Sequence, residues 1–137
     1  MNSQYSHMPA IGKHTPISTY RLQLSSEFTF EDAQKHLGYW RDLGITDLFL
    51  SPILQAVPGS MHGYDVVDHK HISKELGGRE QFEKLATAAH QEGFGIVVDL
   101  VPNHMAVPTP VWINRPMWSV LKRGILSPSL ILTTSDG

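Results

Sequence analysis

Apolar positions recur along the chain in a pattern that predicts alternating strands and helices. Short apolar runs rich in β-branched or bulky residues occur at about 18–24, 46–50 and 95–101, and such runs are typical of strands. Between them, apolar residues recur at helical spacing over about 29–43 and 79–92, which predicts two helices that each bury one face. Right-handed crossovers make strands in this order parallel.

Local signals mark the ends of the first expected helix. Thr29, with Asp32 three residues later, resembles a capping box at the start. Gly44 supplies a residue that tolerates the left-handed conformation at the end. The sequence therefore predicts one helix between these two signals.

A further short helix is expected near the end of the chain. Asn114 is a suitable cap for its start, and Gly124 is a suitable stop. Trp112 and Trp118 lie in the same segment, where they either pack against the body or form a platform for a sugar.

The third strand-like run has the composition of a strand that is buried on both faces. Val97, Val98 and Leu100 suit a central strand of a parallel sheet. Pro102 forbids further ladder pairing and turns the chain out at the carboxyl end.

Polar residues follow this run and also the run before it. Asp99, Asn103 and His104 lie at the end of the third strand, and a second polar cluster, 62–68, lies in the long segment 51–77. We expect that segment to be a loop. The carboxyl ends of parallel strands share one edge, where α/β proteins place their chemistry. Simple capping of loop amides is an equally good interpretation of Asp99 and Asn103 taken alone.

The composition is that of an ordinary globular chain. Charged residues make up 18%, hydrophobic residues 41%, and the formal net charge is −2, which gives no electrostatic reason to expect nucleic acid or anionic lipid. The absence of cysteine excludes a disulfide framework and a thiolate nucleophile. Residues 1–15 lack the pattern of a secretory signal, and no window approaches the roughly 18 apolar residues of a membrane span. We expect a cytoplasmic protein with no nucleic acid partner and no membrane association.

Two blocks resemble the α-amylase superfamily of glycoside hydrolases and transglycosidases. Asp99–His104 matches its Asp-x-x-x-Asn-His signature, and Gly63–Asp65 matches the Gly-Tyr-Asp segment that precedes it. Within that superfamily, three flanking blocks are similar to the maltooligosyl trehalose synthase family. These blocks are Thr19–Leu24, Leu50–Leu54 and Val101–Val107.

The resemblance implies an α/β fold of the (βα)8 TIM-barrel type. A complete barrel needs about 250 residues, so this chain of 137 residues is interpreted as an amino-terminal fragment. It is expected to hold the first three parallel strands, two crossover helices and a long loop after strand 2. Residues 1–15 are expected to be a flexible terminus and 16–128 the amino-terminal part of the catalytic barrel. Residues 129–137 depart from the family pattern and are expected to be a truncated or frameshifted tail.

The resemblance also implies an isomerase activity in trehalose biosynthesis. By intramolecular transglycosylation, the family converts the reducing-end α-1,4 linkage of a maltooligosaccharide into an α,α-1,1 linkage. Its nucleophile and its acid/base follow later strands of the barrel, so we expect them beyond residue 137, nominate no catalytic residue, and expect the isolated chain to be inactive. An amylase-like α-glucan hydrolase and a non-catalytic glucan-binding remnant are the alternatives.

The residues that match the family motifs belong to a sugar-binding wall. The resemblance implies that His104 donates a hydrogen bond to a glucose hydroxyl and that Tyr64 stacks on the apolar face of that sugar. A half-buried packing role is the alternative for Tyr64. Asp65 and His62 are expected to share its hydrogen-bond network, although Asp65 could equally cap loop amides.

Supporting roles are expected for Asp99 and Asn103. Asp99 would be costly to bury unpaired, so we expect it to orient neighbouring groups such as an arginine. Asn103 resembles a calcium-ligand position of many α-amylases. A single amide is weak evidence for a calcium site, which takes about six to eight oxygen ligands. His69 and His71 lack an established zinc pattern. We expect no metal and no other cofactor, and a maltooligosaccharide or α-1,4-glucan as substrate.

Overall fold

A three-stranded parallel sheet, covered on one side by helices, is the centre of the fold. The computed structural model describes residues 14–129, so most of the expected flexible terminus (1–15) and tail (129–137) lies outside the described residues. In chain order the elements are β1 (Thr19–Leu22), α1 (Phe30–Lys35), α2 (Leu37–Asp42), β2 (Asp47–Leu50), β3 (Leu54–Ala56), β4 (Val66–Ile72), α3 (Gly78–Gln91), β5 (Gly95–Val98) and α4 (Arg115–Arg123), with short 3-10 helices at Val111–Ile113 and Gly124–Leu126.

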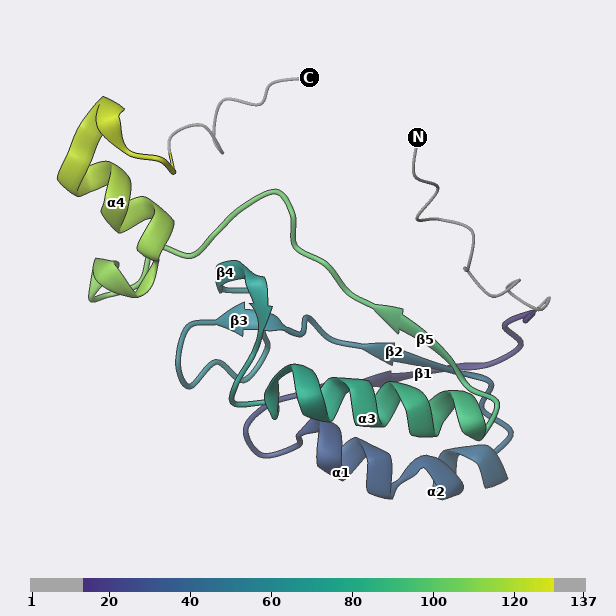
Figure 1. Ribbon diagram of the computed structural model, residues 1–137. Coiled ribbons are helices and arrows are strands. Elements are labelled where there is room, and N and C mark those ends of the chain that lie inside the picture. Colours follow the sequence, from purple (N-terminus) through teal and green to yellow (C-terminus); the bar gives the residue numbers. More distant parts are fainter. Residues whose placement is uncertain (1–13, 130–137) are drawn as a thin grey trace.

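The strands lie in the order β1-β2-β5, and both neighbouring pairs are parallel. Leu22, Leu50 and Val98 form one row across the sheet. Helices α1, α2 and α3 all lie on the same side of these strands (Figure 1). The predicted α/β content, parallel strands and second crossover helix are therefore confirmed.

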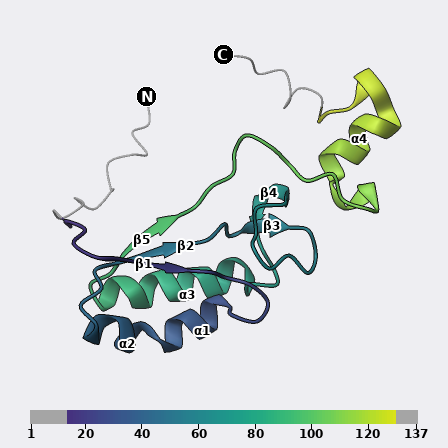
Figure 2. The ribbon, with the colours of Figure 1, turned by 180° about the vertical axis from the view of Figure 1, so that it is seen from behind.

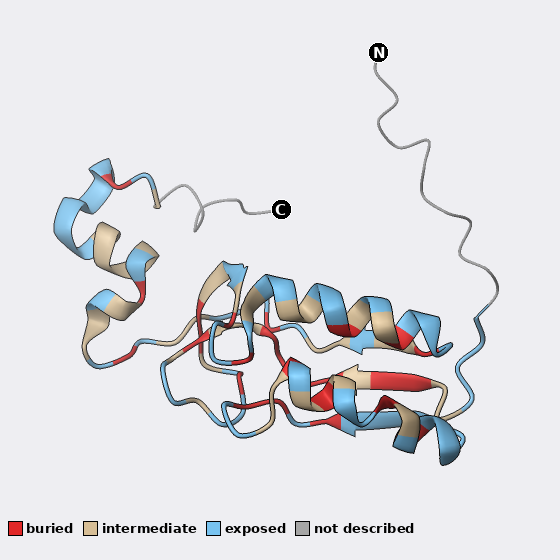
Figure 3. Cartoon of the chain, turned by 60° about the horizontal axis from the view of Figure 1, so that its bottom comes forward, coloured by how far each residue is buried: buried red, intermediate tan, exposed pale blue. Residues whose placement is uncertain are grey.

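The core lies between this sheet and the three helices. Buried residues line the strands and the helix faces that turn toward them (Figure 3). Full burial of one aliphatic or aromatic side chain contributes about 1.5–3 kcal/mol, so this cluster holds the layers together. Its buried members are Leu22, Leu24, Phe30, Ala33, Leu37, Trp40, Leu48, Leu50, Ile53, Leu76, Leu85, Ala89 and Phe94.

The prediction of one continuous helix after β1 is wrong. The capping box is present, since Thr29 N–H donates to the Asp32 carboxylate at 3.0 Å, but the helix breaks at His36 into α1 and α2. Nδ1 of His36 lies 2.8 Å from the carbonyl oxygen of Asp32, and the His36 N–H turns to Ala33 O instead. The side chain thus takes the acceptor that an unbroken helix would use.

The segment 51–77, expected to be a loop, contains an antiparallel hairpin. β3 pairs with β4 through irregular register, with Leu54 opposite Ile72 and Ala56 opposite Val66. Val66 is buried and gives β4 an apolar residue that favours the strand conformation. Residues 57–65, which join the two strands, form the hairpin loop.

Strand β5 is not buried on both faces as predicted. Val97 is 47% exposed and Leu100 is 63% exposed. β5 is an edge strand, and the helices cover only one face of the sheet, as the reverse view also shows (Figure 2). Val97 points to the uncovered face, because side chains alternate along a strand.

The predicted terminal helix is confirmed as α4. Oδ1 of Asn114 accepts from the Met117 N–H at 3.0 Å, and Gly124 ends the helix with φ of 56°. Asn114 is buried, and its Nδ2 donates to the Ala106 carbonyl at 2.8 Å. Ala106 N–H donates in turn to Val66 O, which ties the segment to β4. Every helix within residues 14–129 is too short or too polar to cross a bilayer.

A buried carboxylate sits at the amino end of β2. Asp47 is 3% exposed, and its oxygens lie 2.8 Å from His14 Nε2 and 2.6 Å from the Thr46 hydroxyl. Burial raises the pKa of Asp47, but the hydrogen bonds from Thr46 and His14 outweigh it and leave the pKa below its ordinary value. Gly95 lies alongside, where a side chain would collide with this pair.

Because the pKa of Asp47 is lowered by folding, its stabilisation is present above the unfolded-state pKa of about 3.9 and is lost as the pH falls through the lower folded-state value. We predict that Asp47→Asn makes the free energy of unfolding fall less steeply than in the wild type between about pH 5 and pH 2. Urea unfolding followed by circular dichroism measures the slope, with Asp42→Asn, an exposed position, as the matched control. Equal slopes for Asp47→Asn and the wild type would contradict the prediction.

Candidate functional site: a tyrosine wall at the strand ends

Tyr64 joins the two polar clusters that the sequence places far apart. Its phenolic O–H donates to Oδ2 of Asp99 at 2.6 Å, across 35 residues of sequence. Asp99 follows β5 directly, and its N–H donates to Leu50 O at 2.9 Å, which extends the β2–β5 pairing by one residue. The acceptor of the phenol is therefore fixed by the sheet itself, and a hydrogen bond to a charged acceptor is among the stronger ones.

Hydrogen bonds within the hairpin loop, residues 57–65, set the position of Tyr64. The hydroxyl of Ser60 accepts from Gly63 N–H at 3.1 Å and donates to the carboxylate of Asp65. Val57 N–H donates to the carbonyl of Asp65 at 3.0 Å. Asp65 is half-buried, so its position suits closure of the loop better than direct contact with a ligand.

Gly63 has a steric reason to precede Tyr64. Its φ is 79°, in the left-handed region, and a Cβ atom at this position would lie 2.6 Å from the Pro52 carbonyl oxygen. No side chain fits that space. The glycine of the Gly-Tyr-Asp block is thus required by the close approach between the loop and Pro52, just after β2.

His62 lies beside Tyr64. The two rings are stacked with their centroids 6.0 Å apart, and Tyr64 N–H donates to His62 Nδ1 at 3.1 Å. Tyr64 remains 37% exposed. One flank of the phenol ring is therefore occupied by protein, and part of its surface is open to solvent.

Arg21 and Gln23 complete the cluster, and sequence reasoning did not select them as site residues. Arg21 donates from one guanidinium nitrogen to Gln23 Oε1 at 2.8 Å and from the other to Tyr64 Oη at 3.3 Å. Gln23 Nε2 donates to the carbonyl of His62 at 3.4 Å. The available signal was their alternation with Leu22 and Leu24, which places both polar side chains on the uncovered face.

His104 and Asn103 are exposed and lie close to each other. Nδ1 of His104 is 2.9 Å from Oδ1 of Asn103. Within residues 14–129, neither a hydrogen bond nor a ring contact joins His104 to Tyr64. The structure thus brings Tyr64 together with Asp99 and His62, and places His104 on the segment that follows.

The histidines of β4 are engaged in local contacts. His69 Nε2 lies 2.8 Å from the Val101 carbonyl, and His71 Nδ1 lies 2.7 Å from Asp68 Oδ2. Burial raises the pKa of Asp68, but hydrogen bonds from the Lys70 N–H and from His71 outweigh this effect and leave the pKa below its ordinary value. Across residues 14–129, no group of three or more His, Asp and Glu side chains is placed to share a metal ion.

A cavity near this region is lined by other residues. A cavity of about 510 Å³ lies between the hairpin and residues 113–115, and none of the predicted sugar-site residues lines it. Its polar walls include Gln55, Asp68, His71, Lys74, Glu75 and Arg115. The Tyr64 cluster is instead an open surface at the strand ends.

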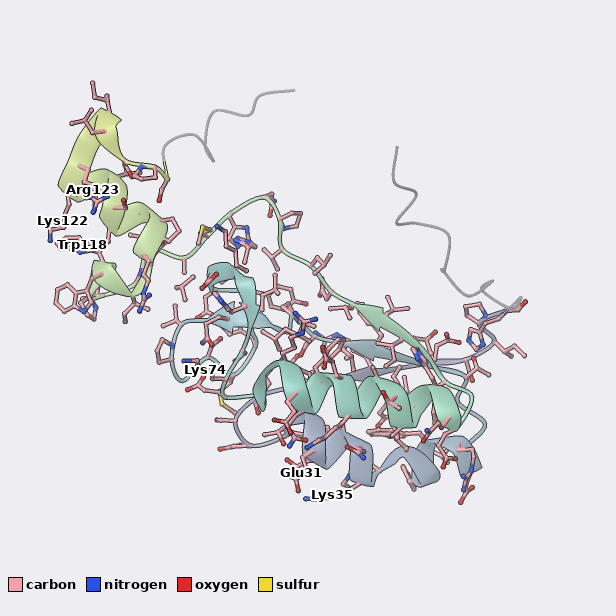
Figure 4. The ribbon with its side chains drawn as sticks, viewed as in Figure 1. Glu31, Lys35, Lys74, Trp118, Lys122 and Arg123 are labelled. Carbon is pink, nitrogen blue, oxygen red and sulfur yellow. The ribbon has the colours of Figure 1, made fainter. Side chains whose placement is uncertain are left out.

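The two terminal tryptophans do not form a flat platform. Trp112 and Trp118 meet edge to face, with ring centroids 6.3 Å apart and an interplanar angle of 64°. Lys122 Nζ lies 5.4 Å from the centre of the Trp118 ring. Figure 4 shows Trp118 and Lys122 on α4, apart from the strand ends.

Known proteins resemble this chain in sequence and in fold. The family model described as "Alpha amylase, catalytic domain" matches residues 30–115. A structure of maltooligosyltrehalose synthase from Arthrobacter ramosus is 51% identical, with a TM-score of 0.80, over 83% of this chain and 15% of that chain. A provisionally assigned maltooligosyl trehalose synthase of Mycobacterium tuberculosis is 49% identical over 113 residues, which are 79% of this chain and 15% of that protein.

More distant relatives share a shorter stretch. Alpha-amylase 3 of Dictyoglomus thermophilum is 41% identical over 78 residues, which are 57% of this chain and 15% of that protein. This chain thus spans about 15% of the length of each of these three relatives. A match of the catalytic-domain model to more than half of its residues shows that the chain belongs to the α-amylase family.

Proposed function

We propose that this chain is part of a maltooligosyl trehalose synthase and supplies one wall of its glucose-binding site. The observation that carries the proposal is the hydrogen bond from Tyr64 to Asp99, because it unites the two sequence blocks of the family at the ends of neighbouring strands. Identity of 51% to the Arthrobacter ramosus enzyme supports the choice within the family. On this proposal, residues 16–128 form the first three strands of an eight-stranded barrel.

The Tyr64 phenol suits stacking on a sugar. A pyranose carries C–H bonds on one face, so contact with an aromatic ring removes apolar area from water while the sugar hydroxyls stay free. The hydroxyl of Tyr64 already donates to Asp99 and accepts from Arg21. The residue therefore offers its ring, and not its hydroxyl, to the ligand.

On this proposal, His104 makes the polar contact with the same glucose. Its Nδ1 faces Asn103, which orients the ring, and on this proposal Nε2 makes the contact with a sugar hydroxyl. His62 and Asp65 act as supports, since the first flanks Tyr64 and the second closes the hairpin loop. Asp99 and Asn103 orient Tyr64 and His104 respectively.

The proposed reaction needs this wall to hold glucose after the first bond is broken. In retaining catalysis a carboxylate forms a glycosyl-enzyme and a second carboxyl group, about 5–5.5 Å away, protonates the leaving oxygen. We assign both groups to the part of the enzyme that lies outside these 137 residues. The released glucose must turn and attack in place of water, which requires a site that keeps it bound and excludes solvent.

An α-glucan hydrolase is the second candidate function. It is favoured by the 41% identity to an α-amylase of Dictyoglomus thermophilum over 78 residues. Hydrolase and synthase differ in access of water to the glycosyl-enzyme more than in the residues of this wall. The chain spans 15% of the length of its Mycobacterium tuberculosis relative. A role as a glucan-binding module without catalysis is compatible with this short span.

In a full-length enzyme that carries this segment, we predict that Tyr64→Ala raises the ratio of free glucose to trehalosyl product severalfold. The variant loses the surface that retains glucose, so water competes better for the intermediate. Chromatographic analysis of products from maltopentaose gives the ratio, and Tyr39→Ala, an exposed position on α2, is the control. An unchanged ratio in Tyr64→Ala would remove this residue from the proposed wall.

For the isolated chain, we predict no turnover of maltopentaose. The proposed nucleophile and acid are not among its residues, and removal of such groups costs many orders of magnitude in rate. Prolonged incubation of purified protein, followed by product analysis, tests this. Trehalosyl product formed in proportion to protein concentration would show that essential carboxylates lie within these 137 residues.

A further inference from the structure

We propose that Arg21 and Gln23, at the carboxyl end of β1, are positioning residues that hold Tyr64 in its sugar-stacking orientation. This inference rests on the proposed function of Tyr64. It assigns to β1 a role in the site, although neither side chain needs to touch the ligand.

The Arg21 guanidinium is held at three places. It donates to Gln23 Oε1 at 2.8 Å and to Tyr64 Oη at 3.3 Å. Its Cζ lies 5.9 Å from the centre of the Phe49 ring, and Phe49 is the residue paired with Arg21 across β1 and β2. The register of the sheet therefore fixes where the guanidinium lies.

Gln23 holds the backbone of the hairpin loop just before Tyr64. Its Nε2 donates to the carbonyls of Met61 at 3.1 Å and His62 at 3.4 Å. Its Oε1 accepts from Arg21, so the amide is oriented at both ends. Residues at the end of β1 thus donate hydrogen bonds both to the loop backbone and to the Tyr64 side chain.

Both hydrogen-bonding functions of the Tyr64 hydroxyl are used. Its O–H donates to Asp99, and its oxygen accepts from Arg21. These two partners come from β1 and from the end of β5, on opposite edges of the three-stranded sheet. Swinging the side chain about its Cα–Cβ bond would carry Oη away from both partners, so the position of the exposed ring is held before any ligand arrives, which reduces the ordering cost of binding.

The geometry requires an arginine and not just a positive charge. Two different nitrogens of one planar group reach two different residues, while the guanidinium carbon lies 5.9 Å from the centre of the Phe49 ring. A lysine ammonium is a compact point charge on a flexible stem and cannot reproduce this arrangement. Arg21→Lys and Arg21→Gln therefore separate a geometric role from an electrostatic one.

The experiment uses the 137-residue chain with 13C-labelled tyrosine and maltoheptaose as the probe. We expect Arg21→Gln and Arg21→Lys each to move the Tyr64 Cζ resonance and to leave that of Tyr39 unchanged. We expect both to weaken maltoheptaose binding by up to about tenfold, because the Arg21–Tyr64 hydrogen bond no longer holds the ring in place before binding. Arg79→Gln is the control, because Arg79 pairs with Glu83 on the remote exposed side of α3. Thermal unfolding of every variant establishes that it is folded.

Each outcome bears on one proposal. Unchanged affinity and an unchanged Tyr64 resonance in Arg21→Gln would overturn the positioning role. Full retention of affinity in Arg21→Lys, with loss in Arg21→Gln, would overturn the geometric part and leave a charge effect. If the wild-type chain itself fails to bind maltoheptaose, the proposed glucose wall fails, while the Tyr64 resonance still decides whether Arg21 positions the ring.

Discussion

The hydrogen bond between Tyr64 and Asp99 connects the local architecture of this chain to its proposed chemistry. Its acceptor is set by the parallel pairing of β2 and β5, which continues one residue beyond the strands through Asp99 N–H. Its donor is set by the hairpin loop, whose close approach to Pro52 only Gly63 permits. A slip in either the sheet register or the loop would separate the two groups, so both must be correct for the site to exist.

The two faces of the sheet have different roles: the face toward the helices contributes to stability, and the uncovered face contributes to the proposed recognition. Leu22 and Leu24 of the β1 segment turn toward the helices and are buried, whereas Arg21 and Gln23 alternate with them and reach the hairpin loop. This division follows from the two-residue repeat of a strand. One strand can thus contribute to the core and to the proposed site without conflict.

Several features of the fold could be predicted from the sequence because their signals are local. The strand-like runs, the helix α3 and the Asn114 and Gly124 ends of α4 were expected and are confirmed, as is the resemblance to maltooligosyl trehalose synthase. The break at His36 was missed because it depends on a side chain that takes a backbone acceptor. The exposure of Val97 was missed because composition does not reveal which face of a strand lacks a covering layer.

The candidate site was predictable only in part, for a related reason. Motifs identified Tyr64 and Asp99, but their hydrogen bond depends on how a hairpin folds over a strand end. Arg21 and Gln23 belong to a block that was noticed only as a family likeness, since a polar residue within a strand gives no sign of its distant partner.

The most direct test of the central claim is a double-mutant cycle with Tyr64→Phe and Asp99→Ala, measured as the free energy of urea unfolding of the chain. Because the bond joins a neutral donor to a charged acceptor at a partly exposed position, we expect a coupling energy of about 1 kcal/mol. If the loss of unfolding free energy in the double variant equals the sum of the losses in the two single variants, the two residues act independently. That result would contradict the account.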